Sequence, residues 1–155
     1  MMQPVVDIHV HMQPWEMLKP EVLAAFRGTQ PEFDRLQELV RNPAKFVALM
    51  DHEGITRAGI VNYGSPEVTG FTREVNDWAA RYCGAFPDRL IPFGSVDPWE
   101  DGDVGAEMDR LIEHLRFPAL KLHPPHQLFY PNQYRTGLKA LETIYNKAQQ
   151  AGVVV

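Results

Sequence analysis

The chain has 155 residues, a length that suits a single domain. Its formal net charge of −5 offers no broad basic face to nucleic acid or to anionic membranes, so we expect neither as a partner. Hydrophobic residues make up 45% and charged residues 23%, which excludes intrinsic disorder. The single cysteine, Cys83, cannot form an internal disulfide and suits a reducing compartment such as the cytoplasm.

Four short apolar runs, separated by segments with helical periodicity, predict buried parallel strands at Val5–Val10, Ala58–Tyr63, Leu90–Val96 and Ala119–His123. A fifth run begins at Gly152–Val155. Alternating strands and helices predict a parallel sheet with right-handed crossovers. The later strands start roughly 30 residues apart, as successive βα units do. Eight such units would need about 250 residues, the size of a (β/α)₈ barrel. We therefore interpret the chain as the first four units of such a barrel and the start of strand 5.

The segment from Met12 to Asn42 is long for a connection between a strand and a helix, which usually takes about 2–6 residues. It contains two short helical candidates, near Glu21–Phe26 and Glu32–Val40. Within one domain of residues 1–155, we predict that it forms an ordered lid over the carboxyl ends of the strands, anchored by Trp15. The alternative is a decoration of the surface.

The sharpest chemical feature is Asp7-Ile8-His9-Val10-His11 at the end of the first predicted strand. Side chains alternate along a strand, so Asp7, His9 and His11 share one face. Three polar residues on one face of a buried strand indicate that this face opens into a solvated site. Two neutral imidazoles two residues apart can chelate one divalent ion, and a hydrogen-bonded pair of structural histidines is the alternative.

The fourth predicted strand repeats this pattern. Lys121 and His123 share one face, whereas Leu120 and Leu122 share the other. We expect Lys121 and His123 to point into the same cavity as His9 and His11. Lys121 could bind a substrate carboxylate or bridge metal ions after carbamylation. It could equally pair with an acid such as Asp7, because an unpaired buried ammonium group is costly.

Other polar residues give weaker signals. Asp97 shares a strand face with Ser95, and capping of the following loop is slightly favoured over a functional role for it. His52, His114 and Cys83 lie in helical patterns and are interpreted as structural or solvated, whereas His126 stays open. The sequence has no Gly-rich phosphate loop, no Gly-x-Ser-x-Gly elbow and no Cys-x-x-Cys pair.

These residues resemble the amidohydrolase superfamily, in particular its branch of metal-dependent hydrolases and decarboxylases related to aminocarboxymuconate-semialdehyde decarboxylase. The matching segments, in the family's order, are VVDIHVHMQP, LMDHEGITRAGIV, FPDRLIPFGSVDP and ALKLHPP followed by AGVVV. The resemblance implies a (β/α)₈ barrel with one divalent ion, most often zinc, with manganese second, and His9 and His11 as ligands. It also implies a histidine on the fifth strand and an aspartate on the eighth, beyond these 155 residues.

The resemblance further implies hydrolysis or non-oxidative decarboxylation of a small carboxylated substrate by the complete constellation. The substrate pocket is expected to include Lys121, His123, Trp15 and Asp7. Two alternatives stay open: a half-barrel without catalytic activity that acts through interactions, and a compact five-stranded α/β domain that binds a small ligand. If the chain is half of a barrel, with or without catalytic activity, its partner is another copy of the chain or the remainder of the barrel.

Overall fold

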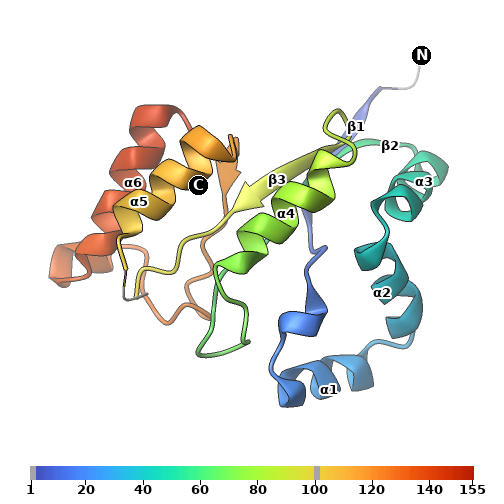
Figure 1. The fold of residues 1–155 in the computed structure, drawn as a ribbon, viewed down its shortest axis with the longest axis horizontal. Helices are drawn as coiled ribbons and strands as arrows, with labels where there is room; N and C mark the ends of the chain where they lie inside the picture. Colours follow the sequence, from blue (N-terminus) through green and yellow to red (C-terminus); the bar gives the residue numbers. More distant parts are fainter. Residues whose placement is uncertain (1–2, 100–101) are drawn as a thin grey trace.

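The computed structural model describes residues 3–99 and 102–155, and its centre is a sheet of four parallel strands (Figure 1). The strands are β1 (Val5–Val10), β2 (Ile55–Ile60), β3 (Leu90–Gly94) and β4 (Ala119–Leu120). They lie side by side in chain order, and Val154 forms a parallel bridge to Ala119 where the fifth strand was expected. A doubly wound sheet would reverse its strand order at a switch point. The sequential order is therefore that of half a (β/α)₈ barrel, as predicted, and not of the compact five-stranded alternative.

Three strands differ in their bounds from the sequence prediction, and β3 ends at Gly94, two residues before the predicted Val96. β2 begins and ends three residues earlier, because Arg57, Ala58 and Ile60 pair with β1 and the next residues leave the ladder. β4 is shorter than predicted, since only Ala119 and Leu120 pair with β3. Lys121 still follows the strand direction, because its backbone N–H donates to the Gly94 carbonyl at 2.7 Å.

Each of the later strands is preceded or followed by a helix of the outer layer. These helices are α3 (Pro43–Glu53), α4 (Glu74–Gly84), α5 (Val104–Asp109), which continues into the π-helical turn η2 (Arg110–His114), and α6 (Lys139–Ala151), which follows the 3₁₀ turn η3 (Gln133–Thr136). Gly54 ends α3 in the left-handed conformation at φ 72°, as the sequence predicts. Within residues 3–99 and 102–155, no helix combines the length and the apolar character that crossing a membrane requires.

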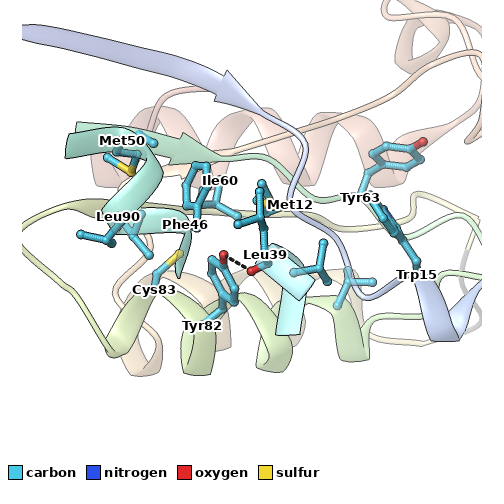
Figure 2. Packing of buried hydrophobic residues seen from close by; sticks show 14 of the residues in the cluster. Met12, Trp15, Leu39, Phe46, Met50, Ile60, Tyr63, Tyr82, Cys83 and Leu90 are labelled. Atoms are coloured by element: carbon cyan, nitrogen blue, oxygen red, sulfur yellow. Dashed lines mark hydrogen bonds between the residues drawn. The ribbon is translucent and has the colours of Figure 1, made fainter. Parts of the chain in front are cut away.

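The hydrophobic core lies between the sheet and these helices. In its first half, Met50 of α3 and Cys83 of α4 pack with Ile60 and Leu90 of the sheet (Figure 2). The second half joins α5 and α6 to β4 through Leu111, Leu120, Leu141 and other buried residues. The helical stripes seen in the sequence are thus the faces that pack on the sheet.

The segment between β1 and α3 folds into the 3₁₀ turn η1 (Trp15–Met17) and helices α1 (Pro20–Thr29) and α2 (Phe33–Arg41). α1 lies beyond the carboxyl end of β1 (Figure 1). The chain before α1 is tied to the loop after β2, because Lys19 N–H donates to the Thr69 carbonyl at 2.8 Å. Gly70 permits this approach, since it has φ 95° and a Cβ there would lie 2.8 Å from the Lys19 nitrogen.

Helix α2 takes a different position from α1 and joins the outer helix layer. The Tyr82 hydroxyl of α4 donates to the Leu39 carbonyl of α2 at 2.9 Å (Figure 2). Phe33 and Val40 of α2 are buried in the first half of the core. The segment is therefore ordered, and a lid role for its first part stays a prediction.

The first strand is far more exposed than the sequence suggests. Among the described residues β1 pairs only with β2, and the side chains of Val6 and Ile8 are 47% and 65% exposed. The prediction of a buried strand is wrong for β1, because no described element covers its outer edge or its apolar face. The strand therefore presents both unpaired backbone groups and aliphatic side chains at one side of the sheet.

Burial makes Cys83 a test of this packing. The thiol is 2% exposed, and burial raises its pKa to about 12. Because a neutral thiol is favoured in the folded state, the contribution of Cys83 to the free energy of unfolding is fully present below about pH 8.5 and is lost as pH rises above it.

We expect the native thiol to react with a disulfide reagent at pH 8 at least about 1000-fold more slowly than a free cysteine. Absorbance of the released thiolate measures this; fast labelling without denaturant would contradict the packing.

Candidate metal centre

The polar face of β1 brings the two imidazoles of the His-x-His motif together. The Nε2 atoms of His9 and His11 lie 3.0 Å apart, and the ring centroids are 5.0 Å apart. Two imidazole nitrogens at about 2.1 Å from one ion lie about 3.0 Å apart when the angle at the ion is near 90°. The arrangement therefore fits two cis ligands of one divalent ion. Among the described residues no cluster of three or more His, Cys, Asp and Glu side chains completes such a site.

The surroundings of His11 favour the neutral form that a metal requires. Partial burial lowers the pKa of His11, and the neighbouring His9 and Lys121 lower it further. A hydrogen bond with the Gln13 side chain acts in the opposite direction. A lowered pKa favours the neutral His11 ring, which is the form that can bind a metal ion.

Asp7 has a local structural contact. Its Oδ1 accepts a hydrogen bond from the backbone N–H of His9 at 3.0 Å. The carboxylate thus helps fix the backbone at the end of β1. A contact between Asp7 and Lys121 does not occur among the ion pairs of the described residues.

The structure brings the polar end of β4 toward the same place. Lys121 is half-buried and close enough to lower the pKa of both His11 and His123, although burial is the largest cause for each ring. His11 itself contributes to the lowered pKa of His123. The charges of Lys121 and His11 thus reach the His123 ring, and a shared cavity for these residues stays a prediction.

A cluster that the sequence left unassigned adjoins this region. The Tyr63 hydroxyl is hydrogen-bonded to His126 Nδ1 at 2.8 Å, and the rings of His126 and His123 stack with centroids 4.2 Å apart. The Ser65 hydroxyl also donates to the His126 carbonyl at 2.6 Å. Tyr63 comes just after β2, and polar groups also follow the other strands at this position. In the sequence, however, its aromatic ring belongs to the apolar run Ala58–Tyr63 and does not indicate a site.

Trp15 lies in the core and not in open solvent. It is 5% exposed, stacks on Phe33 at a centroid distance of 5.4 Å and meets Phe26 edge-on at 4.8 Å. One face of it borders a cavity of about 180 Å³ together with Tyr63 and His126. Trp15 therefore connects the segment after β1 with the cluster around His126.

A second cavity, of about 430 Å³, lies on the other side of His126. Its lining includes Glu67, Asp97 and Trp99. The Asp97 carboxylate accepts a hydrogen bond from the Trp99 backbone N–H at 2.9 Å, so it caps this loop as the sequence suggests. Burial raises the pKa of Asp97, and the charge of Glu67 adds to the effect, while the Trp99 hydrogen bond opposes it.

The sequential parallel strands define half of a (β/α)₈ barrel, with a His-x-His pair at the end of its first strand. Sequence comparison names the family. The sequence model of the amidohydrolase family matches residues 6–155. The chain therefore belongs to the amidohydrolase family, which confirms the resemblance. No curated protein matches the whole sequence closely enough to count as a relative.

Solved structures of the same fold are described as decarboxylases and a hydratase. A 2,6-dihydroxybenzoate decarboxylase in complex with 2,6-dihydroxybenzoate is similar at TM-score 0.61 and 22% identity, over 98% of this chain and 49% of that one. A manganese-bound 5-carboxyvanillate decarboxylase from Novosphingobium aromaticivorans gives 0.59 and 21%, over 86% and 41%. A 4-oxalomesaconate hydratase from Rhodopseudomonas palustris gives 0.58 and 18%, over 96% and 50%.

The chain spans about half the length of these proteins. At such identities the similarity shows the fold alone, a partial (β/α)₈ barrel.

Proposed function

We propose that this chain forms the metal-binding first half of a metal-dependent hydrolase or non-oxidative decarboxylase that acts on a small carboxylated substrate. The observation that carries the proposal is the 3.0 Å separation of the His9 and His11 Nε2 atoms at the carboxyl end of β1. Zinc is the preferred ion for imidazole ligands, and the manganese in the 5-carboxyvanillate decarboxylase supports manganese as the second choice. A bound ion would polarise a substrate oxygen or lower the pKa of a bound water.

The chain's own residues would orient the substrate. The charge of Lys121 acts on the His11 ring, so Lys121 would bind the substrate carboxylate. His11 and His123, kept neutral by burial and by Lys121, would leave that ammonium group as the positive charge in this region. The carboxylate that one structural neighbour binds, 2,6-dihydroxybenzoate, supplies a concrete probe.

We expect Lys121→Gln to weaken binding of 2,6-dihydroxybenzoate by the manganese-loaded chain about tenfold to hundredfold. A hydrogen bond to a charged group contributes about 1.5–3 kcal/mol, which the neutral amide loses in large part. Isothermal titration calorimetry measures the change. Lys139→Gln is the matched control, because that lysine is 76% exposed on α6. Equal weakening by both variants, or no effect of Lys121→Gln, would remove Lys121 from the pocket.

The proposal also covers the partner of the chain and its cellular compartment. The remaining ligands of a complete centre would come from the remainder of the barrel or from a second copy of the chain. A buried free thiol at Cys83 supports a reducing compartment such as the cytoplasm.

A further inference from the structure

The cavity of about 430 Å³ lies between the loops that follow β2, β3 and β4, and two carboxylates line it. They belong to Glu67 and Asp97, and no Lys or Arg side chain of the described residues contributes to the lining. Neither carboxylate forms an ion pair within residues 3–99 and 102–155. Lys19 contacts the same loop, but its Nζ donates to the Glu67 backbone carbonyl at 2.5 Å. Among these residues, the two acids therefore have no counter-ion.

Asp97 is the buried member of the pair. It is 8% exposed, and its Oδ1 accepts a hydrogen bond from the Trp99 backbone N–H at 2.9 Å. Its Oδ2 has no hydrogen-bond partner among the described residues and is not sealed off, so it opens into the cavity. Burial raises the pKa of Asp97, and the nearby charge of Glu67 raises it too. A cation beside both carboxylates would offset the desolvation and the repulsion together.

The buried amide in the lining is already engaged at both ends. Gln127 Oε1 accepts from the His123 backbone N–H at 2.7 Å, and its Nε2 donates to the Val96 carbonyl at 3.0 Å. These bonds join the loop after β4 to the end of β3 and hold the wall of the cavity. The carboxylates, and not this amide, are therefore the acceptors left for an occupant.

The remaining wall is apolar and unusually open to solvent. Trp99 is 50% exposed and Leu128 is 59% exposed, and both line the cavity. Leu128 also has φ 54°, a left-handed conformation that is uncommon for any residue but glycine. Large apolar side chains exposed together mark binding grooves, and the face of a tryptophan attracts cations. This wall suits the apolar part of a positively charged organic molecule.

We propose that this cavity binds a small organic amine. Its ammonium group lies between Glu67 and Asp97 and donates to Asp97 Oδ2, and its apolar body packs on Trp99 and Leu128. The inference goes beyond the proposed function, because it requires no metal and names a cationic ligand, whereas the proposed substrate is an anion. A divalent metal fits less well, since no cluster of three ligating side chains occurs among the described residues and an apolar wall offers it nothing.

The test uses benzylamine and benzyl alcohol with the metal-free 155-residue chain. At pH 7 benzylamine carries a charged ammonium group, whereas benzyl alcohol has nearly the same shape and no charge. We expect benzylamine to bind at least about tenfold more tightly, as a charge-assisted hydrogen bond provides. Ligand-observed NMR titration measures both affinities. Added salt should weaken the binding of benzylamine and leave that of benzyl alcohol unchanged.

Three variants separate the parts of the inference. Asp97→Asn keeps the shape and the acceptor for the Trp99 N–H, and it should reduce the affinity for benzylamine about tenfold. Asp88→Asn is the matched control, because it removes the same charge from an exposed turn before β3 and should change neither affinity. Trp99→Ala should weaken both probes, because it removes the aromatic wall.

Equal affinities of the wild-type chain for the two probes would overturn the ammonium site even if Asp97→Asn does not fold. An equal loss in Asp97→Asn and Asp88→Asn would show attraction by the net charge alone and would also overturn it. Binding unchanged by Trp99→Ala would remove the apolar body from this cavity. Displacement of benzylamine by an equal concentration of calcium would assign the carboxylates to a metal ion instead. None of these outcomes bears on the metal proposal, which the His9 and His11 variants test.

Discussion

Replacing His9 and His11 together with alanine should abolish stoichiometric binding of zinc and manganese by this chain. The two Nε2 atoms, 3.0 Å apart, are the pair of donors that one ion can share, and no larger cluster of ligating side chains exists among the described residues. Loss of both donors removes the pair that would chelate the ion. Each single alanine variant should weaken binding at least about tenfold, because one imidazole no longer chelates.

Metal content after equilibrium dialysis measures this result. The double variant His52→Ala and His114→Ala is the matched control, since it removes two other imidazoles, both from exposed helix positions. Circular dichroism should show that all variants keep their fold, because His9 and His11 are exposed. Metal content that is unchanged in the His9 and His11 variant would refute the metal centre.

The second large effect concerns association. Val6 and Ile8 on β1, and Val154 and Val155 beyond β4, leave aliphatic side chains exposed at the two sides of the sheet. Such edges carry backbone groups that pair with another strand and apolar surface that gains about 25 cal/mol per Å² when covered. We expect the 155-residue chain to elute well above 17.7 kDa in size-exclusion chromatography, or to aggregate.

Charges on the edge should reverse this association. Val6→Lys combined with Ile8→Lys should shift the protein toward the elution of a 17.7 kDa monomer at little cost in stability, since both positions are already exposed. Leu128→Lys combined with Tyr130→Lys, at exposed loop positions, is the control and should leave the elution unchanged. A wild-type chain that runs as a stable monomer would show that the edges need no partner.

The sequence predicted most of the parts of this molecule that depend on short-range patterns. Alternation along a strand predicted that His9 and His11 share one face, and their Nε2 atoms do lie 3.0 Å apart. Helix ends at glycine, such as Gly54, also follow from local conformation. The family resemblance rested on these segments, and the match of the amidohydrolase family model to residues 6–155 confirmed it.

The rest depends on contacts that no local pattern encodes. Tyr63 and His126 are 63 residues apart, and their hydrogen bond arises only because the loops after β2 and β4 meet. The approach of Glu67 to Asp97 likewise appears only when the surrounding segments are in place. The exposure of β1 escaped prediction because its apolar residues resemble those of a covered strand.

His126 forms a wall of both cavities, one of about 180 Å³ and one of about 430 Å³. Its ring is held by Tyr63 on one side and by stacking on His123 on the other. The two volumes are therefore not independent: rotation of this imidazole out of the smaller cavity would break its bond to Tyr63 and take space from the larger one. Substituents on a ligand at one side of His126 thus limit what the other side can hold.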